Sequence, residues 1–270
     1  MTRKIRLDLL LVEKGMVESR EKAKSLIMAG KVFHEHERLD KPGMMVEEDR
    51  RITLKGELHP FVSRGGLKLA KAIQEFGLNL KDKIIADIGA STGGFTDCSL
   101  QNGAAKVYAI DVGYGQLDWK LRSDPRVVCL ERTNARFLTG ESLPEMVDWV
   151  VCDVSFISLT KIFPAMLSIL RNQGEVLALI KPQFEAGREN VGKNGVVKNP
   201  EVHASVIKNV LHNAVIQGFQ VKGLSFSPIR GPEGNIEFLV WLKKSDSEEP
   251  SLNWNAMIAE LIRQAQTGTE

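Results

Sequence analysis

The pattern of apolar and polar positions changes near residue 60 of this 270-residue chain. Before that point, Leu7–Lys14 fits a short helix ended by Gly15, and Ser19 is a favourable N-cap for a second helix. Apolar residues recur on one face of the second helix, at Ala23, Leu26 and Ile27. The chain is therefore predicted to begin with a pair of short helices.

A small sheet and a linker are expected after the helix pair. Lys31–Phe33 and Arg51–Leu54 have strand character, and Lys41–Gly43 is a turn. Gly56–Pro60 contains both glycine and proline, which is typical of a linker. We predict a small α+β domain at 1–57, a linker at 58–62, a larger domain at 63–245 and a partly helical tail at 246–270.

From residue 61 onward, strand-like runs alternate with helical stretches. The expected strands are Lys83–Ile88, Lys106–Asp111, Val127–Leu130, Trp149–Asp153, Glu175–Ile180, Val221–Ser227 and Glu237–Lys243. The expected helices are Leu67–Phe76, Thr96–Asn102, Lys161–Leu170 and Glu201–Gln217. This alternation predicts an α/β fold with a doubly wound, mostly parallel sheet. No helix separates the last two strands, so the seventh strand is expected to be antiparallel, which resembles the class I (Rossmann-like) methyltransferase fold.

Composition adds only local information about partners. The net charge is +2, so overall charge does not indicate a polyanionic partner. The first 31 residues contain eight Lys/Arg against four Asp/Glu, so a nucleic-acid contact is expected there if anywhere.

The remaining special residues fit an ordinary core. Cys98, Cys129 and Cys152 form no C-x-x-C pair and are expected to be reduced core residues; Trp119, Trp149 and Trp241 are expected to be buried or half-buried. No apolar run resembles a signal peptide or approaches the ~18 residues of a membrane span. We expect a cytoplasmic monomer without a metal site.

A glycine-rich turn follows the first strand of the larger segment. It reads D-I-G-A-S-T-G-G-F, with an acid two residues before its first glycine, and Ser91 stands where G-x-G-x-x-G requires glycine. Glycines let the backbone approach a ligand at the start of a helix. The turn resembles the S-adenosylmethionine loop, and its candidate cofactor contacts are Asp87, Gly89, Ala90, Ser91, Gly93, Gly94 and Phe95.

An acid at the end of the next strand supports this cofactor. Asp111 comes 22 residues after Gly89, where a carboxylate can accept hydrogen bonds from ribose hydroxyls. Val112, Asn134 and Asp153 follow strand ends where this fold usually touches the rest of the cofactor. The sequence predicts S-adenosyl-L-methionine as the cofactor.

The turn after the fourth strand narrows the acceptor of the methyl group. Asp153-Val-Ser-Phe differs from the D/N-P-P-Y turn of amino-group methylases, and Cys152 lacks the Pro-Cys pair of cytosine carbon-five methylases. A neutral lysine can take the proton of a ribose 2′-hydroxyl if burial or another cation lowers its pKa. Lys181 follows the fifth strand; Lys68 and Lys71 share the helix before the first, and spacing does not choose between them.

A resemblance to known families completes the assignment. Lys68, Asp153, Lys181 and Glu237 resemble the Lys-Asp-Lys-Glu tetrad of FtsJ-type RNA 2′-O-methyltransferases, which selects Lys68 and makes Lys181 the proton acceptor or the residue that steers the hydroxyl. With the motifs V-S-R-G-G-L-K, D-V-G-Y-G-Q-L, K-P-Q-F-E-A-G and G-P-E-G-N-I-E-F, the chain is identified as a member of the TlyA (haemolysin A-like) family over roughly residues 4–244. The resemblance implies methyl transfer to a ribose hydroxyl of cytidine in ribosomal RNA, with ribosomal subunits as partners.

The N-terminal segment resembles the small RNA-binding domain first named from a protein of the small ribosomal subunit. The resemblance rests on R-L-D, S-R and G-K-V at ordered spacing. It implies phosphate contacts by Arg3, Arg6, Arg20, Lys22, Lys24 and Lys31, and Arg64 in V-S-R-G-G-L-K is a further RNA candidate. The competing interpretation is that these are solvated charges on ordinary helices.

The loop Glu185–Asn199 has two possible roles. With Arg188, Lys193 and Lys198, it is either an RNA clamp or a mobile surface loop. Two rival functions also remain for the whole chain. One is a non-catalytic ribosome-assembly factor; the second, a pore-forming haemolysin, is disfavoured because the sequence shows no long apolar helix or export signal.

Overall fold

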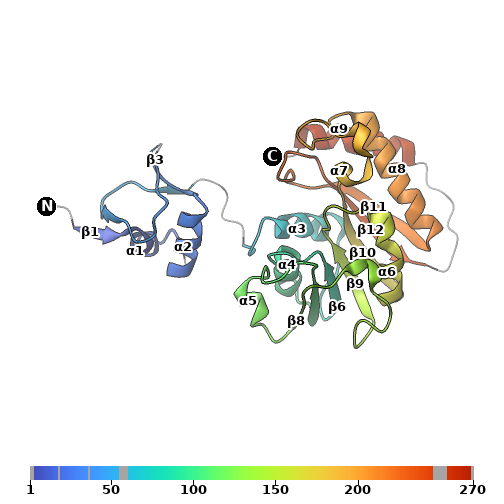
Figure 1. The fold of residues 1–270 in the computed structure, drawn as a ribbon, viewed down its shortest axis with the longest axis horizontal. Coiled ribbons are helices and arrows are strands. Elements are labelled where there is room, and N and C mark those ends of the chain that lie inside the picture. Colours follow the sequence, from blue (N-terminus) through green and yellow to red (C-terminus); the bar gives the residue numbers. More distant parts are fainter. Residues whose placement is uncertain (1–2, 18, 36, 55–59, 246–253, 269–270) are drawn as a thin grey trace. The chain divides into compact units, whose positions relative to one another are not determined.

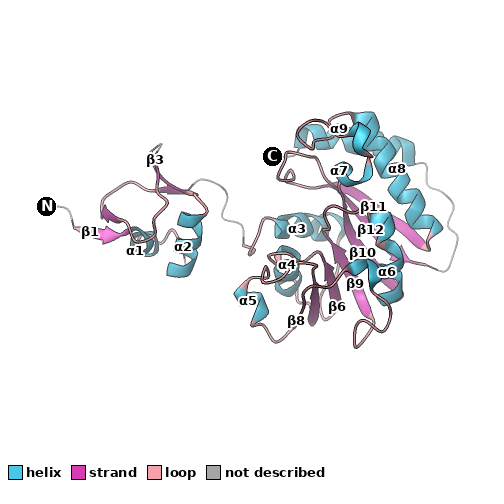
Figure 2. Ribbon diagram, viewed as in Figure 1, coloured by secondary structure: helices cyan, strands magenta, loops and turns pink. Residues whose placement is uncertain are grey.

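The computed structural model describes residues 3–17, 19–35, 37–54, 60–245 and 254–268 (Figures 1 and 2). The chain divides into two compact units, Met1–Leu58 and His59–Glu270. The residue limits of the predicted linker and tail stay predictions, because 55–59 and 246–253 lie outside the described residues.

The first unit packs two helices with short strands. Its elements are β1 (Lys4–Arg6), α1 (Leu7–Glu13), α2 (Arg20–Met28), β2 (Val32–His34), β3 (Glu37–Arg38), β4 (Met45–Glu47) and β5 (Thr53–Leu54). Strands β1 and β4 pair antiparallel, and β3-β2-β5 form a second small sheet. Ser19 caps α2, since its Oγ accepts a hydrogen bond from the backbone N–H of Lys22 at 3.2 Å. The apolar face of α2 packs on α1 through Leu7, Leu10, Leu11, Ala23, Leu26 and Ile27, as the spacing predicts.

The second unit contains a seven-stranded sheet with the order β11-β12-β10-β9-β6-β7-β8. Its strands are β6 (Ile84–Ile88), β7 (Lys106–Ile110), β8 (Val127–Leu130), β9 (Val147–Cys152), β10 (Leu170–Ile180), β11 (Phe219–Phe226) and β12 (Phe238–Lys244). Strands β8, β7, β6, β9 and β10 are parallel, and β12 runs antiparallel to both of its neighbours. The predicted mostly parallel sheet with a reversed last strand is confirmed.

Helices cover both faces of this sheet (Figures 1 and 2). They are α3 (Gly65–Phe76), α4 (Gly94–Gln101), α5 (Trp119–Arg122), α6 (Phe163–Ile169), α7 (Pro182–Glu185), α8 (Pro200–Ile216) and α9 (Trp254–Gly268), with short 3-10 turns η1 (Ala135–Phe137), η2 (Leu159–Lys161) and η3 (Arg188–Asn190). Alternate strand residues feed two separate cores, because successive side chains point to opposite faces. One core contains α3, α4 and α5, and the other contains α6, α8 and α9.

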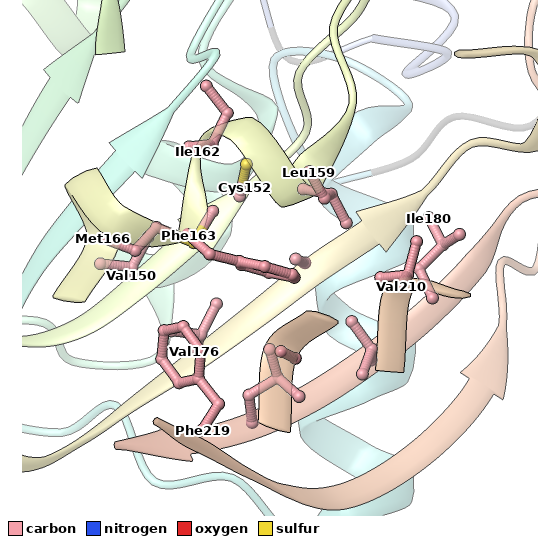
Figure 3. Close-up of a cluster of buried hydrophobic side chains, with 14 of the residues drawn as sticks. Val150, Cys152, Leu159, Ile162, Phe163, Met166, Val176, Ile180, Val210 and Phe219 are labelled. Carbon is pink, nitrogen blue, oxygen red and sulfur yellow. The ribbon is translucent and has the colours of Figure 1, made fainter. Parts of the chain in front are cut away.

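The core under α6 and α8 shows how tightly the sheet is covered. Phe163 of α6 meets Phe219 of β11 edge to face, with ring centroids 5.5 Å apart, and Val176 and Val210 lie in the same cluster (Figure 3). Cys152 is fully buried there, as expected for a core cysteine.

Some sequence expectations need correction. Trp149 and Trp241 are buried or half-buried, but the expectation for Trp119 is wrong, since its side chain is 77% exposed on α5. Strand β10 begins at Leu170, five residues earlier than expected, and its pairing with β9 shifts register between Leu170 and Glu175. No helix within the described residues is both long and apolar enough to cross a membrane.

Candidate active site

The predicted cofactor turn and catalytic residues meet at one edge of the sheet. Strand β6 has β7 on one side and β9 on the other, so the chain order reverses there and ligands are expected beyond the carboxyl ends. The glycine turn follows β6, Asp153 follows β9, and Lys181 follows β10. Glu237 directly precedes β12, which is antiparallel to β10 and pairs its first residue, Phe238, with Ile180 at the end of β10. Glu237 therefore lies at the edge where the parallel strands end.

The four predicted tetrad residues form one network of charges. Lys68 Nζ donates to Glu237 Oε2 at 2.7 Å and to Asp153 Oδ2 at 3.1 Å. The other oxygen of Asp153, Oδ1, lies 2.5 Å from Lys181 Nζ. Lys68, Lys181 and Glu237 are 7%, 8% and 1% exposed. Two cations and two anions therefore balance in a largely buried cluster, with Asp153 joining the lysines.

Ion pairing controls the protonation of Lys68 and Asp153. Burial alone would lower the pKa of Lys68, but Asp153 and Glu237 outweigh it and hold the pKa above its ordinary value. Burial would likewise raise the pKa of Asp153, and Lys68 and Lys181 outweigh it and lower that pKa. Lys68 therefore stays an ammonium and Asp153 a carboxylate.

The structure shows which lysine of α3, Lys68 or Lys71, belongs to the charge network, a choice that sequence spacing leaves open. Lys71 Nζ donates to the backbone oxygen of Phe226 at 2.8 Å and lies 3.3 Å from the centroid of its ring. Lys71 Nζ also lies 3.8 Å from Glu75 Oε2 on the same helix. Lys68 is thus the lysine of α3 that reaches Asp153 and Glu237.

Ser155 and Phe156, in the turn after Asp153, also lie at the candidate site, although the sequence alone indicates no role for them. Lys181 Nζ donates to Ser155 Oγ at 3.0 Å, and Ser155 is exposed. Phe156 is 91% exposed, adopts a φ of 65°, and lies with its ring centroid 5.1 Å from that of Phe184. A left-handed φ is strained for an aromatic residue and marks a functional candidate, but it cannot be read from a sequence.

The glycines of the turn also let the tetrad elements approach. A Cβ on Gly89 would lie 2.9 Å from the backbone oxygen of Asp153, and one on Gly94 would lie 2.8 Å from the backbone nitrogen of Gly66 in α3. Gly89 therefore allows the turn bearing Asp153 to pack closely, and Gly94 does the same for the helix bearing Lys68.

Asp87 is a buried carboxylate beneath the turn. Its Oδ2 accepts a 2.6 Å hydrogen bond from Thr96 Oγ1, and its Oδ1 has no hydrogen-bond partner among the described residues. Burial raises the pKa of Asp87 to about 7, although the hydrogen bond from Thr96 opposes the rise. An unpaired buried oxygen is costly, so a cationic or hydrogen-bond-donating ligand would fit there.

The other predicted cofactor residues differ in exposure and in how their side chains are held. Asp111 accepts hydrogen bonds from the backbone N–H groups of Ser91, at 2.8 Å, and Gly113, at 2.7 Å, so its carboxylate is fixed at the end of β7. Ala90 and Phe95 are buried, whereas Val112 is largely exposed. Asn134 is exposed, and its Oδ1 accepts from the backbone N–H of Arg136 at the start of η1.

The predicted RNA contacts of the first unit differ in how they are held. Arg6 and Arg20 both bind the buried Asp8. Arg3 lies 4.0 Å from Glu48. Lys22 is exposed and Lys24 and Lys31 are half-exposed; in the second unit Arg64 and the loop residues Arg188, Lys193 and Lys198 are exposed. No group of His, Cys, Asp or Glu in the described part of the chain is arranged to hold a metal ion.

Comparison with known proteins bears directly on this site. Residues 61–244 match the FtsJ-like methyltransferase model, and residues 5–52 match the S4 domain. The YqxC protein of Bacillus subtilis (strain 168) is 55% identical over 89% of this chain and 86% of its own. TlyA of Mycobacterium tuberculosis, named a 16S/23S rRNA (cytidine-2′-O)-methyltransferase, is 44% identical over 90% of this chain and 91% of its own. The chain belongs to the TlyA family of FtsJ-like methyltransferases.

A solved structure agrees with this TlyA-family assignment over both domains. A candidate haemolysin from Streptococcus thermophilus is 49% identical, with a TM-score of 0.78, and covers 99% of this chain and 98% of its own. The S4 domain and the FtsJ-like domain of this TlyA-family chain thus occur together in a solved relative.

Proposed function

We propose that the chain transfers a methyl group from S-adenosyl-L-methionine to a ribose 2′-hydroxyl, of cytidine, in ribosomal RNA. The observation that carries the proposal is the buried network of Lys68, Asp153, Lys181 and Glu237 beside the glycine turn. FtsJ-like family membership and the S4 domain support the reaction type and an RNA substrate.

The residues at the turn fit the proposed cofactor. Asp87 offers an unpaired buried oxygen, and Asp111 is held by two backbone N–H groups with acceptor capacity left for ribose hydroxyls. Asp87, Asp111 and the backbone of the glycine turn would hold the cofactor, with Val112 and Asn134 at its edge. When bound, the cofactor supplies a methyl group on a positively charged sulfur.

We assign the proposed chemistry to Lys181, whose Nζ is hydrogen-bonded to the exposed Ser155. Lys181 orients the ribose hydroxyl for in-line displacement and, when neutral, takes up its proton. Asp153 and Ser155 fix Nζ from two directions, at 2.5 and 3.0 Å. Lys68 and Glu237 hold Asp153 in place, because Lys68 Nζ bridges the two carboxylates.

The acceptor is proposed from the relatives and from the surface of the site. The Mycobacterium tuberculosis relative is named for cytidine-2′-O methylation of ribosomal RNA. The exposed ring of Phe156 offers a face on which an unstacked nucleobase can stack. We propose that the reaction takes place in the cytoplasm, as a ribosomal substrate implies, and that a monomer carries it out.

The direct test is methylation of isolated small and large ribosomal subunits with labelled cofactor. We expect label in ribosomal RNA, at a cytidine that stops reverse transcription at low nucleotide concentration. A Lys181→Ala variant should leave the RNA unlabelled while still binding it. RNA binding by the unaltered chain without any label transfer would instead support a non-catalytic assembly role.

A further inference from the structure

One buried carboxylate joins two of the arginines that are proposed to contact RNA. The Asp8 side chain is 0% exposed. Arg6 donates from Nε to Asp8 Oδ1 at 3.0 Å and from Nη2 to Oδ2 at 2.9 Å, while Arg20 donates from Nε to Oδ2 at 2.9 Å. We call these three residues the Asp8 fork.

Within the described residues, the bonds to Asp8 leave most outer nitrogens of the two arginines without a hydrogen-bond partner. The three bonds use both Nε atoms and only one outer nitrogen, Nη2 of Arg6. A guanidinium has five N–H donors, so several donors remain for an outside acceptor. The arginine side chains are 41% and 42% exposed, although the carboxylate between them is buried.

The turn that follows the helix pair holds the fork from another side. The backbone N–H of Asp8 donates to Pro42 O at 3.0 Å. The outer nitrogens of Arg6 lie so close to Gly43 that a Cβ there would be 3.3 Å from them. Asp8 and the turn therefore contact the Arg6 guanidinium, and its side chain keeps 41% of its surface exposed.

The charge of the fork suits a phosphate. Hydrogen bonds from Arg6, and then from Arg20, hold the pKa of Asp8 at about 2 against the effect of its burial. The carboxylate therefore remains ionised, and two guanidiniums against one carboxylate leave one positive charge. Paired guanidinium N–H groups match the geometry of phosphate oxygens.

We propose that Asp8 is a positioning residue that fixes Arg6 and Arg20 as one binding site for a phosphate of the RNA backbone. The proposal rests on the RNA substrate of the proposed function. Asp8 itself does not touch the RNA; it sets the direction in which the two guanidiniums face.

The proposal and simple charge attraction predict opposite results for Asp8→Asn. The substitution raises the net charge by one, so unspecific attraction to RNA predicts tighter binding. Loss of positioning predicts weaker binding, although no arginine has been removed. The sign of the change therefore separates the two.

The experiment measures the Kd of the full-length chain for labelled ribosomal RNA from isolated subunits at fixed salt. We expect Asp8→Asn to bind about tenfold more weakly than the unaltered chain, because charge-assisted contacts depend on orientation. Glu21→Gln is the matched control, since it removes an exposed acid beside Arg20; it should bind within about twofold of the unaltered chain or slightly more tightly.

A double-mutant cycle separates positioning from a general role in folding. In an Arg6→Ala/Arg20→Ala background, Asp8→Asn should weaken RNA binding no further. Equal or tighter binding by Asp8→Asn alone overturns the proposal, and so does a weakening that persists in the double-alanine background.

A second variant keeps the test valid if Asp8→Asn unfolds the first unit in a thermal melt. Arg20→Lys preserves the charge but cannot both hold Asp8 and present paired donors, so it should bind about fivefold more weakly; unchanged binding contradicts the fork. Failure of the unaltered chain to bind ribosomal RNA would instead remove the proposed function itself.

Discussion

The tetrad and the Asp8 fork share one arrangement, in which a single aspartate forms ion pairs with two basic side chains. Asp153 holds two lysines, and Asp8 holds two arginines. The difference lies in exposure and balance. The tetrad lysines are under 10% exposed and Glu237 balances the charge, whereas the arginines are over 40% exposed and leave one positive charge.

The comparison teaches how surroundings turn one arrangement toward chemistry or toward binding. A lysine exchanges its proton when its environment changes, and burial gives that environment control over it. An arginine stays charged, so an exposed pair of arginines is suited to binding an anion and not to taking up a proton. We therefore expect tetrad variants to change the rate of methyl transfer, and fork variants to change the affinity for RNA.

The largest expected effect divides these two roles. Lys181→Ala should lower kcat about thousandfold, as loss of a positioned proton acceptor does, with the Kd for ribosomal RNA unchanged. Arg20→Ala should do the reverse, raising Kd while kcat at saturating RNA stays the same. Single-turnover methylation and filter binding measure the two quantities. A Lys181→Ala protein that methylates RNA at the normal rate would refute its role.

The next effect tests whether Lys68 belongs to the tetrad. Lys68→Met leaves Glu237 and Asp153 without their shared cation, so we expect about a hundredfold loss of activity and about 3 kcal/mol lower free energy of unfolding. Lys71→Met on the same helix is the control, with activity within about threefold of the unaltered chain. Urea unfolding and methylation assays check both; similar losses in the two variants would argue against the geometry.

A smaller effect is expected at Ser155, the exposed hydrogen-bond partner of Lys181. Ser155→Ala removes one hydrogen bond to Nζ and should lower kcat about tenfold, with KM for RNA unchanged. Ser155→Thr keeps the hydroxyl and should restore most of the rate. A change in KM alone, or a failure of threonine to rescue, would show that Ser155 acts elsewhere.

The smallest effect concerns Asp87, a buried carboxylate that has no ion pair among the described residues. Its pKa of about 7 lies above the ordinary value of 3.8, so the folded state binds more protons between these values. Its contribution to the free energy of unfolding therefore falls as pH rises from about 4 through 7. Asp87→Asn should raise the free energy of unfolding by about 3 kcal/mol more at pH 8 than at pH 5, because the ionisation penalty of about 1.4 kcal/mol per pKa unit grows between these pH values. Equal effects at both pH values in thermal or urea unfolding would contradict this assignment.

The sequence predicted the sheet well because its strands are strongly apolar and its helices lie between them. The ends of the strands were harder to predict. Strand β10 extends back to Leu170 through polar residues, including Gln173 at a φ of 63°, and no apolar pattern indicates such an extension. Trp119 shows the same limit. A large aromatic residue is expected to be buried, but only tertiary packing decides whether its position on the short helix α5 faces the core or solvent.

The part of the site that is formed by residues at strand ends could be predicted from the sequence. Asp153 and Lys181 follow apolar strands, so sheet topology alone brings them together. Lys68 needed the family resemblance, because only tertiary structure distinguishes it from Lys71. The sequence places Asp8 in the R-L-D motif but assigns it no role, since a helical pattern does not reveal which charged residue is buried between two arginines.

The central claim is that Lys181 directs a ribose hydroxyl, and not a base, to the methyl group. The most direct measurement is alkaline hydrolysis of ribosomal RNA methylated by this chain with labelled cofactor. A 2′-O-methyl group blocks cleavage of the neighbouring phosphodiester, so we predict label in alkali-resistant dinucleotides, and none when Lys181→Ala is used. Label recovered in mononucleotides would place the methyl group on a base and contradict this role of Lys181.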